Sequence, residues 1–387
     1  MTAMLLKEIQ RKMTTYYNNG AATTVSVSMQ GSGASEYHAI IRSTAAGEPF
    51  DVQLATVTAA YEHLRERLGE RIVPVFKRYF LSDAANQQPQ LPREEECAVS
   101  IVEQSPLDGT KVALWVYLQE GVAVNNLYNG LFSVHHGVYT HFWQGSACTP
   151  DVRSEVATRA LLCDYALRLE DEGCSIADNC VRTWFFVHDV DVNYAGMVKG
   201  RNEMFSTNNL TADTHFIAST GIGGSHPDPR VTVEMDTYAV KGIAAGQMHY
   251  LYAREYLNPT YEYGVAFERG ACVDYGDRRH VFISGTASIN NRGEVVNKGD
   301  VRAQARRTWE NVGALLAEAE SGWDDVCHMI VYLRDIADYA VVNRMFEERF
   351  PGVPRVIVLA PVCRPEWLIE MECMAVRPLA GNGYAPF

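Results

Sequence analysis

Phe282-Ile-Ser-Gly-Thr-Ala-Ser288 is an apolar run that breaks into a polar turn, and it opens the most regular part of the chain. The residues Val281–Ile283 predict a short strand that ends at Ser284-Gly285. Asp300 then stands where an N-cap is expected, before a run over 301–318 whose apolar residues recur at spacings of three and four. This part of the chain therefore predicts a strand followed by a long amphipathic helix.

The pattern continues with a second strand, a second helix and two closing strands. Residues 326–333 have the β-branched and aromatic bias of a strand, and Asp335 ends it. Residues 341–350 predict the second helix, and residues 356–360 and 368–376 predict the closing strands. Strands and helices that alternate in this order indicate an α+β unit of about one hundred residues.

The same order of elements occurs immediately upstream, which indicates an internal repeat. The closing strand of this copy contains Val233-Glu-Met-Asp236, which corresponds to Ile369-Glu-Met-Glu372 in the last copy. Its predicted elements are a strand and polar turn over 137–146, a helix over 152–169, a strand over 183–189, a helix over 195–205, and strands over 215–219 and 231–240.

A third and weaker copy occupies the N-terminal part of the chain. Each copy ends its middle strand in the same way, with Leu81-Ser-Asp83, Val187-His-Asp189 or Leu333-Arg-Asp335. We therefore expect three domains, a degenerate one over 1–122 and two more over 123–245 and 260–378. The predicted elements of the first copy are a helix over 52–68, strands over 75–83, 98–103 and 112–118, and a polar loop over 84–93 in place of the second helix.

This unit, with its Ser-Gly turn and its closing Ile369-Glu-Met-Glu372, resembles the Rid family of small imine deaminases, also called endoribonuclease L-PSP or YjgF-like proteins. Members of that family are homotrimers whose ligand clefts lie between neighbouring subunits. The resemblance implies three Rid-like (chorismate-mutase-like) domains, each a mixed β-sheet with two helices on one face. We expect one chain to form an intrachain pseudo-trimer, with linkers near 121–130 and 241–262.

The resemblance also implies which residues bind the ligand. The family uses an arginine at the start of the fifth strand, a glutamate fifteen residues later, a Ser-Gly turn, an asparagine in the second helix and an upstream tyrosine. The last unit offers Arg355, Glu370, Ser284-Gly285 and Asn343, with Phe267 where the tyrosine is usual. We expect the site of the protein to lie in this unit.

The other two units depart from the pattern. In the second unit the arginine position falls near Thr220 and Gln144 replaces the serine, although Glu234 is kept. In the first unit Val99 stands for the arginine and Leu114 for the glutamate. Neither unit is expected to bind a carboxylate in the family's manner.

The residue types fit the chemistry that the family performs. A guanidinium group binds a carboxylate through two parallel hydrogen bonds, and a partly buried glutamate can transfer a proton. Taken alone, Arg355 reads as a surface ion-pair partner and Glu370 as a residue that faces solvent. The spacing of the two residues favours a site, with Arg355 as the carboxylate clamp and Glu370 as the general acid or base.

The closing strands also resemble those of chorismatases, which hydrolyse chorismate and are built from Rid-like domains. Cys363 and Glu370 lie seven residues apart, as in that family, and Arg364 follows the cysteine. Phe267-Glu-Arg269 is similar to a chorismatase Phe-Ser-Arg, so Arg269 and Arg364 are further candidates for ligand binding. Cys363 is a candidate nucleophile, because a neighbouring arginine can lower the pKa of a thiol, but its position in an apolar segment favours a packing role.

Two features separate this chain from the chorismatases. Asn290-Asn-Arg-Gly-Glu294 stands where they have a Gly-His pair, and the N-terminal third has no counterpart in them. In the middle unit, Gly200-Arg201 and Thr220-Gly-Ile-Gly223 do look like elements of their N-terminal half.

Composition excludes several classes of function. The 387 residues carry a net charge of −13 with no run of lysine and arginine, which disfavours nucleic acid as a partner. The 9 cysteines are scattered without a C-x-x-C pair, and no histidine cluster has metal-ligand spacing, so we expect reduced thiols, no metal and no cofactor. No apolar run is long enough to span a membrane, and we expect a cytoplasmic protein.

These observations give three candidate functions. The first is hydrolytic deamination of 2-imino or enamino acids at the last unit, and the second is a chorismatase-like hydrolysis. The third is a non-catalytic protein that binds a small carboxylate, since arginine and glutamate serve binding and hydrolysis equally. Association beyond the intrachain pseudo-trimer is compatible with all three.

Overall fold

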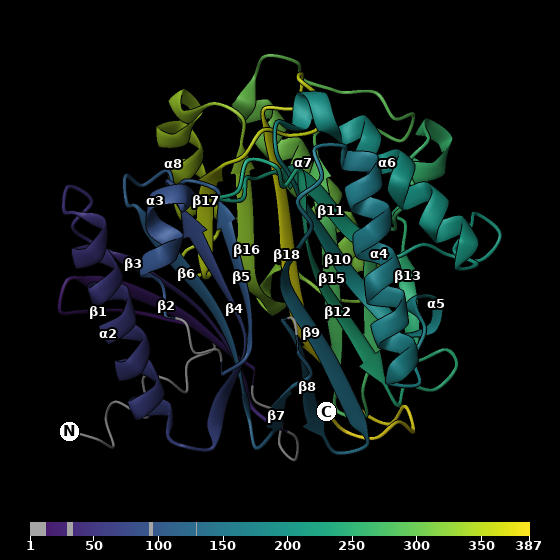
Figure 1. Cartoon of the computed structure of the whole chain (residues 1–387), viewed down its shortest axis with the longest axis horizontal. Coiled ribbons are helices and arrows are strands. Elements are labelled where there is room, and N and C mark those ends of the chain that lie inside the picture. The colour runs from purple at the N-terminus through teal and green to yellow at the C-terminus, as the bar shows by residue number, and fades with distance from the viewer. Residues whose placement is uncertain (1–12, 29–33, 93–95, 129) are drawn as a thin grey trace.

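The computed structural model describes residues 13–28, 34–92, 96–128 and 130–387, and it places them in three mixed six-stranded sheets. Each sheet belongs to one third of the chain (Figure 1), so the expected α+β fold with three Rid-like units is confirmed. We call them unit 1, unit 2 and unit 3 in chain order. Among the described helices none is both long and apolar enough to cross a membrane.

Unit 1 has the strand order β1-β2-β3-β6-β4-β5, with β4 and β5 parallel. Where the sequence predicts a polar loop, the chain forms two short helices, α3 and η1. The elements are β1 (Met13–Asn18), β2 (Ala21–Ser28), β3 (Glu36–Ser43), α2 (Phe50–Leu68), β4 (Ile72–Leu81), α3 (Ala84–Gln87), η1 (Gln88–Gln90), β5 (Ala98–Glu103) and β6 (Val112–Glu120).

Unit 2 has the order β11-β10-β12-β9-β8-β7, with β10 and β11 parallel. Its helices α4 and α6 pack closely, because a side chain at Gly196 or Gly200 would overlap α4. The elements are β7 (Ala123–Asn126), β8 (Leu131–His136), β9 (Tyr139–Cys148), α4 (Ser154–Asp171), α5 (Ile176–Asn179), β10 (Cys180–Val187), α6 (Val190–Thr207), β11 (Ala218–Gly223) and β12 (Val233–Lys241).

Unit 3 has the order β13-β14-β15-β18-β16-β17, with β16 and β17 parallel. Asp300 caps α7 as expected, since its side chain accepts from the backbone N–H groups of Arg302 and Ala303. The elements are β13 (Met248–Leu251), η2 (Thr260–Tyr263), β14 (Gly270–Asp274), β15 (Arg278–Ala287), α7 (Val301–Glu318), η3 (Trp323–Asp325), β16 (Val326–Leu333), η4 (Ile336–Asp338), α8 (Tyr339–Arg349), β17 (Arg355–Leu359) and β18 (Ile369–Pro378).

The three units close into a ring within one chain. Backbone bridges join Glu103 to Ser225, Ala218 to Glu268, and Pro106 to Val358, so each unit is hydrogen-bonded to the other two. Figure 1 shows α2 at one edge of the molecule and α4 and α6 at the opposite edge, with the sheets between them. The inner faces of the sheets therefore pack against one another around an approximate threefold axis, as the resemblance implies.

Aromatic side chains from all three units fill this axis. The rings of Trp115 and His328 stack with centroids 4.2 Å apart, as do those of Trp143 and Tyr238. Phe282 lies beside Tyr238, at 5.3 Å. Such rings contribute large buried apolar areas, so the axis is a hydrophobic core shared by the units.

Candidate active site

The order of the strands places one cleft between each pair of units. Each unit has one edge strand that pairs in parallel: β5 in unit 1, β11 in unit 2 and β17 in unit 3. This edge strand lies against strands that precede the long helix of the neighbouring unit. We name the contacts by their units: the 1–2 cleft lies between β5 and β9, the 2–3 cleft between β11 and β15, and the 3–1 cleft between β17 and the strands of unit 1.

The 1–2 cleft is closed. Gly145 of β9 packs so tightly on β5 that a Cβ atom would overlap the carbonyl of Val99, and Ser146 Oγ accepts a hydrogen bond of 2.7 Å from Ile101 N. Glu234, which occupies the same register position as Glu370, is buried here. Burial and the charge of Asp236 raise its pKa well above the usual value. The carboxyl is therefore closed off from any substrate.

The 3–1 cleft holds Arg355 and Asn343 in a polar cavity of about 180 Å³. Arg355 donates to Phe350 O at 3.2 Å, and its guanidinium lies 4.0 Å from Glu347. In unit 1, the register position of Glu370 is taken by Ala113, which pairs with Arg42. This cleft thus has the arginine of the family but lacks its glutamate.

Arg355 and Glu370 consequently lie in different clefts, and the expectation that they form one site is wrong. The reason is the strand order: β16 separates β17 from β18, so Arg355 on the edge strand faces unit 1 while Glu370 faces unit 2. Asn343 accompanies Arg355. A spacing of fifteen residues identifies two strands of one unit but does not say which neighbour covers each of them.

The register also moves three of the positions assigned in the other units. The counterpart of Arg355 is Ser219 in unit 2, not Thr220, because Ser219 pairs with Thr183 as Arg355 pairs with Met329. Similarly, Gly145 rather than Gln144 matches Ser284, and Ala113 rather than Leu114 matches Glu370. The backbone pairing thus moves each of these three assignments by one residue.

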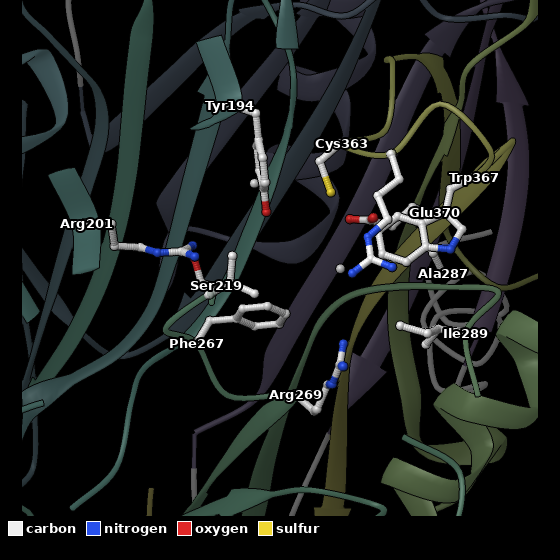
Figure 2. Close-up of a pocket in the computed structure, with 14 residues that line it drawn as sticks. Tyr194, Arg201, Ser219, Phe267, Arg269, Ala287, Ile289, Cys363, Trp367 and Glu370 are labelled. Atoms are coloured by element: carbon white, nitrogen blue, oxygen red, sulfur yellow. The ribbon is translucent and has the colours of Figure 1, made fainter. Parts of the chain in front are cut away.

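The 2–3 cleft contains a cavity of about 230 Å³ into which Glu370 projects from β18 (Figure 2). Its carboxyl lies directly against Gly285, where any Cβ atom would overlap Glu370 Oε1. Burial, followed by the charge of nearby Glu372, raises the pKa of Glu370 to about 8. The side chain is therefore predominantly protonated at neutral pH and can act as an acid.

The Ser-Gly turn is occupied by contacts between units. Ser284 is fully buried, where its hydroxyl accepts from Ser219 N at 2.9 Å and donates to Glu268 O at 2.6 Å. Gly285 N donates to Thr220 Oγ1 at 2.8 Å. Ser284 therefore fixes the floor of the cavity instead of binding a ligand, which corrects the role expected for it. Gly285 lines the cavity as expected.

Three arginines line the cavity, although β11 itself has Ser219 at the arginine position. Arg201 of α6 and Arg269 lie on two sides of Phe267, with their guanidinium carbons 5.7 and 5.3 Å from its ring (Figure 2). Arg364 stacks at 4.6 Å on Trp367 and donates to Gly293 O at 3.1 Å. The cavity is thus surrounded by positive charge and two aromatic walls.

The structure brings together most of the candidates from unit 3 but adds residues of unit 2. Phe267, Arg269, Gly285, Cys363, Arg364 and Glu370 line one cavity, as do Tyr194 and Arg201 from α6 and the aromatic ring of Trp367. The only sequence signal for the α6 residues is the likeness of Gly200-Arg201 to a chorismatase element. Without that likeness, a polar residue such as Arg201 on an amphipathic helix is predicted to be exposed to solvent.

Cys363 is not poised as a nucleophile. Burial and the neighbouring Glu370 raise the pKa of its thiol to about 12, and the opposing effect of Arg364 is smaller. The thiolate expected from the adjacent arginine is therefore not populated near neutral pH. Cys363 lines the cavity as a neutral side chain.

The fold and this interdomain cavity define a Rid-type protein, and comparisons with known proteins agree. The family model for endoribonuclease L-PSP matches residues 272–377. A RutC family protein of Pyrococcus abyssi is 37% identical over 100 residues, which make up 25% of this chain and 78% of that protein. The 3-aminoacrylate deaminase RutC of Acinetobacter baylyi is 33% identical over 97 residues, or 24% of this chain and 77% of that protein. The chain belongs to the Rid (endoribonuclease L-PSP) family.

A larger part of the chain is similar to a solved chorismatase structure. The superposition covers 78% of this chain and 92% of that one, with a TM-score of 0.64 at 18% sequence identity. The likeness is one of fold. It extends well beyond the single unit that the RutC relatives match.

Proposed function

We propose that this protein is a hydrolase of a small carboxylate-bearing metabolite and that the 2–3 cleft is its active site. The observation that carries the proposal is the position of Glu370, a carboxyl whose pKa burial raises to about 8, at the floor of a cavity lined by Arg201, Arg269 and Arg364. Guanidinium groups hold carboxylates, and a carboxylic acid with a pKa near 8 can donate a proton at neutral pH.

The chemistry suits substrates in which C2, beside the carboxylate, carries a nitrogen or oxygen and a double bond. Glu370 gives its proton to the terminal carbon of the double bond, which leaves a cation at C2. Water then adds to C2 and passes a proton to the Glu370 carboxylate. The adduct collapses to a 2-oxo acid, and the substituent takes up the second proton of the water and leaves as ammonia or an alcohol.

An enol ether with two carboxylates, of the chorismate type, fits the cavity best. Three arginines supply more positive charge than one carboxylate requires, and Phe267 and Trp367 offer apolar surface to a ring. Cys363, Glu370, Phe267 and Arg269 also follow the chorismatase pattern.

Deamination of an imino or enamino acid is the second candidate. It is favoured by the 3-aminoacrylate deaminase among the relatives. An enamino acid takes the Glu370 proton on its terminal carbon, whereas an imino acid takes it on its nitrogen; in both cases water then adds to C2. Ser219 stands where the family has its arginine, so the carboxylate must be held by Arg201, Arg269 or Arg364.

The test is a turnover assay with chorismate, and separately with 2-iminobutyrate formed in the assay, each with the wild-type chain. We expect release of pyruvate from the first or of 2-oxobutyrate and ammonia from the second. If both substrates are bound, as shown by thermal shift, and neither is hydrolysed, the protein is the non-catalytic binder and the proposal fails.

The rate should depend on the protonation of Glu370. Because the acid form is active, we expect kcat/KM to be constant below the pKa and to fall as the pH rises through about 8. A profile measured between pH 6 and 10 checks this. A rate that increases over the same range would show that Glu370 acts as a base.

The division of the clefts predicts different effects for two arginines. Arg355→Ala should leave kcat and KM unchanged, because Arg355 lies in the 3–1 cleft. Arg269→Ala should raise KM by about 30-fold or more, since removal of one partner of a buried charge pair costs about 2–5 kcal/mol. Steady-state kinetics of both variants checks this. The reverse order of effects would place the substrate beside Arg355.

A further inference from the structure

A second buried carboxylate lies two residues beyond Glu370 on the same face of β18. Glu372 accepts hydrogen bonds from Arg182 Nη2 at 2.8 Å, Trp184 Nε1 at 2.8 Å and Thr220 Oγ1 at 2.5 Å. All three donors belong to unit 2. Glu372 is therefore an ion-paired carboxylate that three donors of unit 2 hold in place.

The network continues into unit 1. Arg78 of β4 is fully buried, donates to Asp236 at 2.7 Å and lies 3.9 Å from Glu372. The two guanidinium groups of Arg78 and Arg182 thus balance the two carboxylates of Asp236 and Glu372. Ionisation of Glu370 would add a third negative charge to this buried layer, which is unfavourable in a medium of low dielectric constant.

A contact chain links the network to the cavity floor. Thr220 Oγ1 donates to Glu372 and accepts from Arg182 and from Gly285 N. Gly285 in turn carries the surface against which the Glu370 carboxyl rests. The position of the acid therefore depends on the same residues that hold Glu372.

We propose that Glu372 is a positioning residue for the reaction assigned to Glu370: its fixed negative charge keeps the proton on Glu370, and Arg78 gives unit 1 a part in the active site. The inference rests on the proposed function. It also explains a feature of unit 1. This unit has Val99 and Ala113 at the positions of Arg355 and Glu370, yet it still carries the buried Arg78 at the axis.

Other groups near Glu370 modify this effect without reversing it. Arg269 and Arg182 favour its ionised form, but burial and Glu372 outweigh them. Burial keeps the Cys363 thiol and the Tyr332 hydroxyl neutral. The charged and titratable groups around the acid are Glu372 on its own strand, Tyr332 on β16, Arg182 on β10, Tyr194 and Arg201 on α6, Arg269 before β14, and Cys363 and Arg364 in the loop before β18.

The location of the proton can be measured without turnover. In protein labelled with ¹³C at the glutamate carboxyl, the Glu370 resonance is the one that Glu370→Gln removes, and we expect its titration midpoint near pH 8. Glu372→Gln should lower that midpoint by about one pH unit or more. Glu372→Asp, which keeps the charge, should leave it nearly in place. A midpoint that stays or rises in Glu372→Gln would overturn the inference.

The double variant Arg182→Gln, Glu372→Gln provides a second test in which no buried charge is left unpaired. Because Glu372 acts on Glu370 more strongly than Arg182 does, the midpoint should again fall. An unchanged midpoint in the folded double variant would likewise reject the role of Glu372.

Turnover separates this inference from the proposed function. If the midpoint falls from about 8 to 7 or below, kcat/KM of Glu372→Gln at pH 8 should fall about fivefold or more. The pH at which kcat/KM begins to fall should shift to lower values together with the NMR midpoint. A midpoint that moves as expected in a protein that hydrolyses no substrate rejects the proposed function alone. Normal turnover with an unmoved midpoint rejects the role of Glu372 alone.

Discussion

Glu370→Gln should lower kcat by about 10²–10⁴-fold while KM stays within a few-fold. The amide keeps the shape and hydrogen-bonding groups of the side chain but cannot donate the proton that starts the reaction. Steady-state kinetics with the substrate found by the turnover assay measures the effect. A loss of this size with unchanged KM is expected for a group that acts in the transition state rather than in binding.

Glu234→Gln is the matched control. Glu234 has the same register position and also a raised pKa, but it lies in the closed 1–2 cleft. We expect its rate to equal that of the wild type. If the Glu370 variant is as fast as the wild type, Glu370 is not the acid; if the Glu234 variant loses activity, the 1–2 cleft takes part in the reaction.

Arg78→Leu should lower the free energy of unfolding by about 3–5 kcal/mol. The substitution leaves the buried carboxylate of Asp236 without its guanidinium partner, and Arg78 also packs over the rings of Trp115, Trp184 and Phe186. Urea denaturation followed by tryptophan fluorescence measures the change. Adding Asp236→Asn should recover part of the loss, because the unpaired charge is then removed as well.

Arg153→Leu is the control for this experiment. Arg153 also pairs with an aspartate, Asp151, but its side chain is 70% exposed, so its loss should cost less than about 1 kcal/mol. Equal effects of Arg78→Leu and Arg153→Leu would show that the axial network does not stabilise the association of the units.

The repeated unit could be predicted from the sequence because its signals are local. The amphipathic spacing over 301–318, the Asp300 cap and the matching strand ends in three copies each specify an element on their own. The strands that precede each long helix were harder to predict. The structure has three antiparallel strands there in every unit. The sequence predicts one of them in units 2 and 3 and none in unit 1. Strand β2 is mostly alanine, threonine and serine and is buried along nearly its whole length, so it shows no alternation of apolar and polar residues.

The site was only partly predictable because it is formed between units. Glu370, Phe267 and Arg269 could be found within one repeat, but Arg201 belongs to the preceding repeat and meets Phe267 only across the contact between units 2 and 3. Conversely, Arg355 matches the family pattern in sequence, yet its edge strand faces unit 1. Each diverged repeat can keep some of the residues that form a site with a neighbouring repeat. Which of these residues come into contact depends on how the three units pack in the folded ring.

The location of the active site can be settled by a crystal structure of the Glu370→Gln variant soaked with the substrate that the wild type hydrolyses. We expect ligand density in the 2–3 cleft, with a carboxylate on Arg201, Arg269 or Arg364 and the double bond beside the substituted side chain. Density in the 3–1 cleft beside Arg355, with the 2–3 cleft empty, would contradict the assignment.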